Sequence, residues 1–295
     1  MTAVSDRLRW AYHRLVPASV RWPLGRARRD LRDLGRRMVA RRPLPPARLL
    51  DRVQRTPWLD EYLTVGNASA QAVARELGDS VPTDARVLDF GCGLGRTLRP
   101  LLDLAVARHW RIEGCDIDPT MIAWNRGAFP QIRFEVNGEH PPLPYPSGRF
   151  DAVIAISLFT HFDAAGQRRW ARELGRVLQP GGLALLSLMG PRAFASFPDL
   201  QAGGARDRLE HDGFFLDDRG TRFNERGAYH TAKGLALLME PHLELLHHQD
   251  GGLDRFQDVA VLRRPPSSPS APSSAPGPSS ASATARTSAT ASVGR

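Results

Sequence analysis

The sequence predicts an α/β fold in which a mostly parallel β-sheet is buried between helices on both faces. Short apolar runs alternate with amphipathic segments from about residue 57 to residue 263. These runs are nearly continuous in apolar character, and residues 150–156 contain Asp151 as their one polar interruption. The first run leads directly into a glycine-rich turn. Strands buried on both faces have this composition, and their alternation with helices is typical of parallel sheets.

Periodicity places the individual elements along the chain. In the segment 97–107, for example, Leu98, Leu101, Leu102 and Ala105 fall on one helical face. Strands are expected at residues 86–90, 110–115, 132–136, 150–156, 183–188, 243–247 and 257–262. Helices are expected at residues 70–77, 97–107, 121–126, 167–178 and 230–238.

One long loop is expected between the fifth strand and the helix at 230–238, over about residues 189–229. Loops of this length are usually either functional or disordered. Aromatic residues argue against disorder here, and the loop contains Phe194, Phe197, Phe214, Phe215 and Tyr229. We therefore expect this loop to fold over the functional site as a lid that determines selectivity.

The composition excludes several classes of protein. The chain has 295 residues, of which 42% are hydrophobic, and this is enough for a large buried core. No apolar run approaches the roughly 20 residues that a membrane-spanning helix requires, and the N-terminal sequence lacks the apolar centre of a secretory signal. The two cysteines, Cys92 and Cys115, are too few for a disulfide framework. We therefore expect a cytoplasmic protein.

The positive charge is concentrated in an N-terminal extension, residues 1–56. Residues 1–50 contain 13 Arg and 3 Asp, whereas the whole chain has a formal net charge of +9, so the remainder is nearly neutral. Leu31, Leu34 and Met38 recur at helical spacing among these arginines. The extension could pack as a solvated helical arm on the domain edge, lie on an anionic membrane with Trp10 and Trp22 at the interface, or bind nucleic acid.

The C-terminal residues 264–295 are expected to form a disordered tail. They consist largely of Ser, Ala, Pro, Thr and Gly and show no hydrophobic periodicity. Such a segment cannot bury enough apolar surface to offset the entropy lost on ordering. The chain therefore divides into the extension 1–56, a globular domain 57–263 and the tail 264–295.

The strongest motif follows the first strand. It reads Val-Leu-Asp-Phe-Gly-Cys-Gly-Leu-Gly-Arg over residues 87–96, with glycines at Gly91, Gly93 and Gly95. Alternate glycines allow a sharp turn and let a ligand approach backbone N–H groups. The second strand leads to Asp116, about 25 residues after Gly91. A carboxylate at this place can accept both hydroxyls of a ribose.

Two other kinds of nucleotide site do not fit this motif. The dinucleotide fingerprint requires a small residue where this chain has Arg96 or Leu98, depending on the glycine from which it is counted. A P-loop requires a Gly-Lys-Ser/Thr sequence that does not follow here. Alternate glycines with Asp89 just upstream instead suit a ligand that carries an amino-acid end and no pyrophosphate.

Residues 60–263 resemble the class I S-adenosylmethionine (AdoMet)-dependent methyltransferases, especially the small-molecule type. The motif at 87–96 is similar to their first motif, residues 156–162 are similar to their S-x-F-T-H-L segment, and residues 176–182 are similar to their R-V-L-K-P-G-G turn. The resemblance implies AdoMet as the cofactor. It also implies a Rossmann-like, seven-stranded, mostly parallel sheet with strand order 3-2-1-4-5-7-6.

The resemblance assigns the methionine end of AdoMet to the glycine turn. Gly91, Gly93 and Gly95 would border this end of the cofactor. Asp89 would steady the turn and reach the amino group through water.

The resemblance assigns the nucleoside end to the following strands. Asp116 would hold the ribose, Ile117 would pack on the adenine, and Asn137 would lie near the adenine amino group. Asn137 is also a common turn-forming residue type, which is the alternative interpretation. Ser157, after the fourth strand, would lie beside both the cofactor and the substrate.

A general base is the one catalytic group that the chemistry could require. Methyl transfer from a sulfonium is an in-line displacement, so the enzyme mainly aligns the acceptor and excludes water. A base is needed when the acceptor arrives protonated, as an alcohol does. His161, at the mouth of the expected site, is the candidate base, and its alternative role is structural. His230 is a second candidate or a helix-start residue, and no sequence pattern indicates a metal site.

The acceptor is not encoded in these motifs. The favoured function is methyl transfer to O or N of a small molecule or glycoconjugate. The alternatives are an RNA or protein methyltransferase, or a non-catalytic module that binds a membrane or a partner through the basic extension. Enzymes that methylate amino groups of nucleic-acid bases would carry an Asn/Asp-Pro-Pro-Tyr turn where residues 157–160 read Ser-Leu-Phe-Thr. Nucleic acid is therefore the less favoured acceptor.

Overall fold

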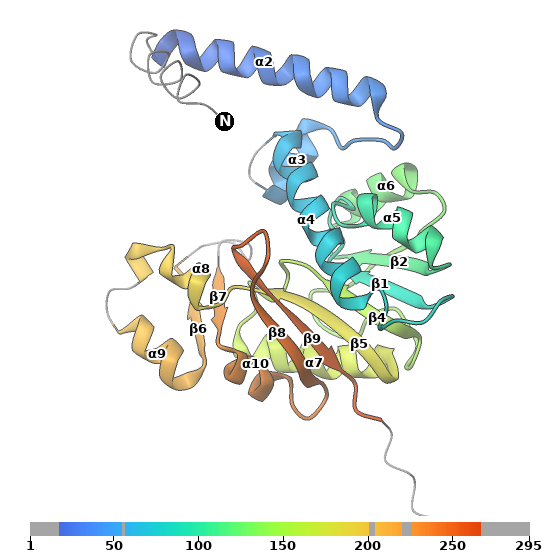
Figure 1. The fold of residues 1–295 in the computed structure, drawn as a ribbon, viewed down its shortest axis with the longest axis vertical. Coiled ribbons are helices and arrows are strands. Elements are labelled where there is room, and N and C mark those ends of the chain that lie inside the picture. The colour runs from blue at the N-terminus through green and yellow to red at the C-terminus, as the bar shows by residue number, and fades with distance from the viewer. Residues whose placement is uncertain (1–17, 55–56, 201–203, 220–225, 267–295) are drawn as a thin grey trace, which may run out of the picture.

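The centre of the protein is a seven-stranded sheet with helices on both faces (Figure 1). The structure is a computed structural model that describes residues 18–54, 57–200, 204–219 and 226–266, with residues 18–28 described by their backbone alone. Most of the expected tail, from residue 267 on, lies outside the described residues.

The strands of the main sheet follow the order β3-β2-β1-β4-β5-β9-β8. The first five are parallel, whereas β9 runs antiparallel between β5 and β8. Counted within this sheet alone, the order is 3-2-1-4-5-7-6, so the predicted topology is confirmed. The strands are β1 (Arg86–Phe90), β2 (Arg111–Asp116), β3 (Arg133–Val136), β4 (Phe150–Ala155), β5 (Leu178–Leu188), β8 (Glu244–Leu253) and β9 (Gln257–Arg263).

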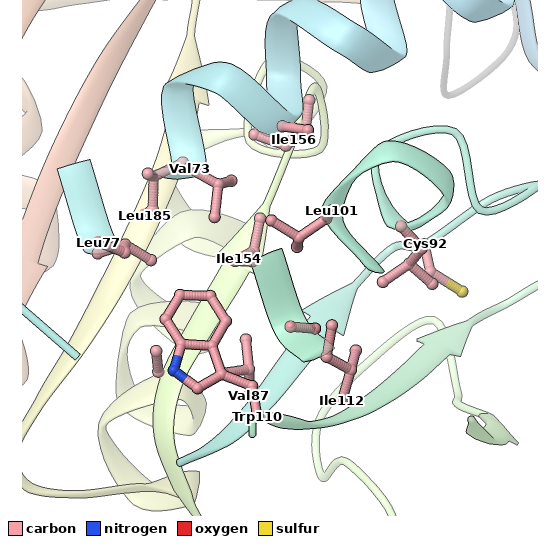
Figure 2. Close-up of a cluster of buried hydrophobic side chains, with 14 of the residues drawn as sticks. Val73, Leu77, Val87, Cys92, Leu101, Trp110, Ile112, Ile154, Ile156 and Leu185 are labelled. Carbon is pink, nitrogen blue, oxygen red and sulfur yellow. The ribbon is translucent and has the colours of Figure 1, made fainter. Parts of the chain in front are cut away.

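The two faces of the sheet are covered by different helices. One face packs against α4 (Leu59–Leu77), α5 (Leu98–Ala107) and α6 (Pro119–Ala128), and Figure 2 shows part of this cluster around Val87 and Ile154. The other face packs against α7 (Ala164–Val177) and α10 (Ala232–Met239). Neighbouring strand residues are buried on opposite faces, which explains the nearly continuous apolar runs in the sequence.

Helix α4 is longer than the helix predicted over residues 70–77, because it begins at Leu59. Its first turns contribute Leu59 and Tyr62 to a separate apolar cluster with Leu50 of α3 (Ala47–Gln54). This cluster also contains Leu94 of the glycine-rich turn. Contacts between segments far apart in sequence therefore extend the helix beyond its locally periodic part.

The expected loop at 189–229 is a folded module with a small core of its own. The core includes Met189, Phe194, Leu209 and Tyr229, and the Phe194 and Tyr229 rings meet edge to face at 5.3 Å. The elements of this module are α8 (Pro191–Ala195), the 3₁₀ helix η1 (Pro198–Leu200), α9 (Ala205–Asp212), β6 (Phe214–Asp217) and β7 (Gly227–His230). The prediction of an irregular loop is wrong, because aromatic packing and the β6–β7 pairing give the segment regular structure.

The described part of the N-terminal extension contains two helices. Helix α2 (Ala18–Val39) lies beyond the helices that cover the sheet, and residues 40–46 connect it to α3 (Figure 1). Within the part of the chain that the structure describes, every helix is too short or too polar to pass through a lipid bilayer.

Candidate functional site

Strand β1 delivers the glycine turn to the carboxyl edge of the sheet. Gly91, Gly93 and Gly95 all have positive φ angles, of 73°, 50° and 70°. A Cβ at Gly91 would lie 2.8 Å from Leu158 Cδ2, so the turn and the loop after β4 are tightly packed at this point. A Cβ at Gly93 would have Val53, at 3.9 Å, as its nearest neighbour. The backbone of Gly93 therefore borders open space.

Helices α4 and α6 hold the turn from behind. The Tyr62 hydroxyl donates a hydrogen bond to the Leu94 carbonyl at 3.0 Å, and Asn125 Nδ2 donates to the Gly93 carbonyl at 2.8 Å. Helix α4 approaches so closely at Gly66 that a Cβ there would overlap the carbonyl oxygen of Arg96. The shape of the turn thus depends on tertiary packing as well as on its glycines.

The acid that ends β2 points back into this turn. Asp116 Oδ2 accepts a hydrogen bond from Gly93 N at 2.8 Å, and its Oδ1 accepts one from Asp118 N at 2.9 Å. Burial raises the pKa of the Asp116 carboxyl above its ordinary value. Asp118 caps α6 by accepting from Thr120 N at 2.8 Å, and it also pairs with Arg52 of α3 at 2.6 Å.

Asp89 lies under the turn with an unsatisfied oxygen. Its side chain is buried, and among the described residues no donor reaches Oδ2. Burial, and then repulsion from the nearby Asp116, raise the pKa of Asp89 to about 7. A buried carboxylate oxygen without a donor is costly unless a ligand satisfies it.

Two adjoining cavities lie at this edge of the sheet. One, of about 320 Å³, is bordered by Asp89, the glycine turn, Ser157 and His161. The other, of about 340 Å³, is mainly apolar and is bordered by Phe90, Phe162, Trp170 and Asn137. The residues that border both cavities are Gly91, Asp116, Ile117 and Leu158. The sequence-predicted site residues other than Gly95 are therefore brought together around one groove. Gly95 faces away from it, because a Cβ there would lie 2.6 Å from Phe129 Cε2.

The apolar cavity contains a polar group at Asn137. Asn137 Nδ2 donates to the Gly138 carbonyl at 2.7 Å, whereas Oδ1 is buried and accepts no hydrogen bond from the described residues. Ile117 borders the same cavity with 53% of its surface exposed. A flat, mainly apolar group with an amino substituent fits this combination of an exposed aliphatic side chain and a free amide oxygen.

Ser157 is held in an unusual backbone conformation by two neighbouring strands. Its φ is 57°, in the left-handed region that non-glycine residues seldom adopt. Its N–H donates to Ser187 Oγ of β5 at 2.6 Å, and its Oγ donates to Gln257 Oε1 of β9 at 3.1 Å. The same Gln257 oxygen accepts from Ser187 Oγ at 2.7 Å. This buried polar network fixes the turn that forms the wall of the first cavity.

His161 borders the first cavity and contacts the folded module. Its Nδ1 lies 2.9 Å from the carbonyl oxygen of Arg226. A carbonyl can only accept, so Nδ1 carries the proton, and in the neutral ring Nε2 keeps its lone pair. Burial lowers the pKa of His161 below its ordinary value, which favours this neutral ring.

His230 does not belong to the site. It ends β7, is almost completely buried, and its Nε2 lies 2.7 Å from Gln167 Nε2 and 2.9 Å from Gln167 Oε1. Burial lowers the pKa of His230 to about 3. Its interpretation as a second catalytic candidate is wrong, because it packs between the module and α7 and borders neither cavity.

Several residues around the groove had no sequence signal that assigned them to it. Arg52 and Val53 of α3 border the first cavity, although α3 lies far upstream of the glycine turn. Trp170 of α7 borders the second cavity, and in the sequence it is one of several apolar residues on a helix. Phe162 could have been found, because it ends the segment 156–162 that resembles the methyltransferase motif.

Comparison with known proteins relates the centre of the chain to methyltransferases. Residues 87–182 match the family described as methyltransferase domain, and this range contains the glycine turn, Asp116 and the loop after β4. A probable S-adenosylmethionine-dependent methyltransferase of Mycolicibacterium smegmatis is 31% identical over 166 residues, which are 53% of this chain and 59% of that protein. Residues 87–182 therefore match a methyltransferase domain, and the chain is similar to S-adenosylmethionine-dependent methyltransferases over about half of its length.

The names of similar proteins give different substrates. The tRNA N(3)-cytidine methyltransferase METTL2B of Homo sapiens is 25% identical over 59% of this chain and 46% of its own length. The sterol 24-C-methyltransferase erg-4 of Neurospora crassa is 29% identical over 63% of this chain and 48% of its own length. The chain thus spans about half the length of the curated relatives it matches.

A solved structure shares the fold of the methyltransferase domain. The PH0226 protein of Pyrococcus horikoshii superposes with a TM-score of 0.50 and 18% identity, over 72% of this chain and 97% of that chain. At this identity the likeness concerns the Rossmann-like fold alone.

Proposed function

We propose that this protein binds AdoMet in the groove at the carboxyl edge of its sheet and transfers the methyl group to O or N of a small molecule or glycoconjugate. The observation that carries the proposal is the pair of cavities joined at Asp116, one mainly apolar and one bounded by the glycine turn. This arrangement suits a nucleoside whose other end is a charged amino acid. Residues 57–263 would form the catalytic domain.

The unsatisfied atoms of the groove fit the functional groups of AdoMet. Asp89 Oδ2 would accept from the amino group, directly or through water, and Asn137 Oδ1 would accept from the adenine amine. Asp116 would bind the ribose, because each carboxylate oxygen can accept a second hydrogen bond beside those from Gly93 and Asp118. Ile117 would cover the adenine, and Gly93 would leave room for the methionine end.

The residues around the first cavity would act on the acceptor. AdoMet supplies an electrophilic methyl group on a sulfonium, so the protein has to align a nucleophile and exclude water. The Arg226 carbonyl orients the His161 ring with Nδ1 protonated, and Nε2 would take the proton of an acceptor hydroxyl. Ser157, fixed by Ser187 and Gln257, would form the wall between cofactor and acceptor.

The folded module would lie beside the loop that forms the acceptor side of the groove. Ala228 N donates to the Thr160 carbonyl at 2.7 Å, next to the contact between Arg226 and His161. Among the described residues of the module none borders either cavity. The module would therefore act at the rim and influence selectivity by its contact with the loop at 157–161.

The cofactor assignment is tested by calorimetric titration of AdoMet into the protein. We expect one site with a micromolar or tighter dissociation constant. Absence of binding to the wild-type protein would refute the assignment. Incubation with methyl-labelled AdoMet and fractionated cell extract then identifies the acceptor, because label transfers to the fraction that contains it.

The role of His161 is tested with the labelled fraction as substrate. His161→Gln should lower kcat by about 10²–10⁴-fold at pH 7 and leave AdoMet affinity unchanged, as expected for a lost general base. His211→Gln is the matched control, because His211 is an exposed histidine of α9. Equal kcat values for both variants would show that His161 is structural.

Total tRNA and a protein extract serve as competing acceptors in the same assay, since one relative is a tRNA methyltransferase by name. Labelling of tRNA or protein in place of the small-molecule fraction would overturn the acceptor class and leave the cofactor assignment standing. AdoMet binding without transfer to any fraction would favour a non-catalytic module.

A further inference from the structure

Helix α2 is amphipathic, and it turns its polar face toward the domain. The helices that cover the sheet instead turn their apolar faces toward it. Its positions 29, 32, 33 and 36 lie on one face, and its positions 31, 34 and 38 lie on the opposite face, by helical spacing. The first set is polar and the second is apolar. A helix that packs on a globular core normally buries its apolar face. Here the polar face contacts the domain.

The polar face is attached to the start of α4. Arg32 and Arg36 both pair with Asp60, and Asp33 Oδ2 accepts from Leu59 N at 3.4 Å. The Arg29 guanidinium lies over the Trp58 ring, 3.9 Å from its centroid. These contacts leave no freedom for the helix to turn its apolar face inward without losing its ion pairs.

The apolar face points into solvent. Leu31, Leu34 and Met38 are 70%, 54% and 80% exposed. In the sequence, Val20, Leu24 and Ala27 stand at the spacing that continues this row toward the N-terminal end of the helix. A continuous apolar row on a surface helix marks an interaction site, because single exposed apolar residues are common but aligned ones are not.

The surrounding charge identifies the partner. Residues 29–42 contain six arginines and two aspartates, and in sequence the excess of Arg continues toward the N-terminus. Arg29, Arg32 and Arg36 face the domain, but the net positive charge of this region attracts an anionic bilayer, whose acyl boundary the outer apolar row can enter.

We propose that the outer face of α2 binds the surface of an anionic lipid bilayer. The helix lies in the interface plane and does not span the membrane, and Arg29, Arg32, Asp33 and Arg36 keep it attached to the domain. The chain continues from α2 through residues 40–46 into α3, whose Arg52 and Val53 border the first cavity. A short stretch of chain therefore connects the lipid-binding helix to the groove. The prediction that Trp10 and Trp22 lie at a membrane interface concerns side chains that the structure does not describe.

The test is flotation of the full chain with vesicles of phosphatidylcholine alone or mixed with phosphatidylglycerol. The variant carries Leu31→Ser, Leu34→Ser and Met38→Ser together. Its matched control carries Val106→Ser and Leu237→Ser, which replace apolar residues 73% and 57% exposed on α5 and α10. Wild type and control should float with the anionic vesicles and less so at high salt, and the α2 variant should bind at least about tenfold more weakly.

Circular dichroism and AdoMet titration establish that the α2 variant is folded. Asp60→Asn, which loosens the attachment of α2 but keeps its apolar face, should still bind the anionic vesicles. Equal flotation of the α2 variant and the wild type would overturn the proposal. So would an absence of vesicle binding together with a dimer, seen by analytical ultracentrifugation, that the α2 variant loses, because the face would then bind a second copy of the chain.

Discussion

The carboxylate of Asp116 accepts a hydrogen bond from the backbone N–H of Gly93 at 2.8 Å and so ties the end of β2 to the turn that leaves β1. The two residues are distant in sequence but adjacent at the sheet edge, because β1 and β2 pair in parallel from Arg86 and Arg111 to Phe90 and Cys115. The acid thus shapes the turn at the same place where it borders both cavities.

Asp116→Ala should therefore impair both folding and cofactor binding. The substitution leaves Gly93 N–H and Asp118 N–H without their acceptor and should lower the free energy of unfolding by about 1–3 kcal/mol. AdoMet affinity should fall at least tenfold, measured by calorimetry. Asp79→Ala, at a fully exposed acid, is the control and should change neither quantity. Wild-type affinity in Asp116→Ala would contradict a role in the groove.

Alanine substitutions at two glycines with positive φ distinguish backbone strain from obstruction of the groove. Gly93 (φ 50°) and Gly181 (φ 80°) both have room for a Cβ, but Gly93 borders the groove and Gly181 does not. Alanine at either position should lower the free energy of unfolding by about 1–2 kcal/mol. Gly93→Ala alone should weaken AdoMet binding. Equal affinities in the two variants would show that the methionine end does not pass Gly93.

The raised pKa of Asp89 predicts a pH dependence of stability. The unfolded carboxyl ionises near its ordinary value of 3.8, whereas the folded one ionises at about 7. Between these values the folded state holds a proton that the unfolded state has lost, so stability falls as the pH rises from 4 to 7. Relative to Asp89→Asn, the wild type should lose about 2–4 kcal/mol of unfolding free energy over this range. Urea denaturation at several pH values measures this change in unfolding free energy. If the unfolding free energies of the two proteins varied with pH in parallel, the buried ionisation would be refuted.

A second pair of glycines tests the close approach of α4 to the turn. Gly66 and Gly127 both lie within helices, but a Cβ at Gly66 meets the Arg96 carbonyl and a Cβ at Gly127 meets nothing within 4 Å. Gly127→Ala should stabilise the protein by up to about 1 kcal/mol, because alanine has the higher helix propensity. Gly66→Ala should destabilise it by about 1–3 kcal/mol and weaken AdoMet binding. Thermal unfolding checks the sign, which must differ between the two variants.

The sequence alone determined the sheet and the ligand turn. The mainly apolar runs in β1 and β4, the glycines at 91, 93 and 95, and Asp116 at the end of the second strand are local patterns, and each has a direct physical meaning. Strand order followed from a family resemblance that rests on those same motifs, and the structure confirms it.

Only the tertiary structure decided which histidine reaches the groove, how the segment 189–229 is built, and which way α2 faces. In the sequence His161 follows a predicted strand and His230 begins a predicted helix, but in the structure one borders the first cavity and the other is buried against Gln167. By sequence alone the arginines of α2 could form a solvated face, whereas in the structure arginines of this helix contact Asp60 and Trp58. These outcomes depend on contacts between residues far apart in the chain, and periodicity within a segment carries no information about what the rest of the molecule places against it.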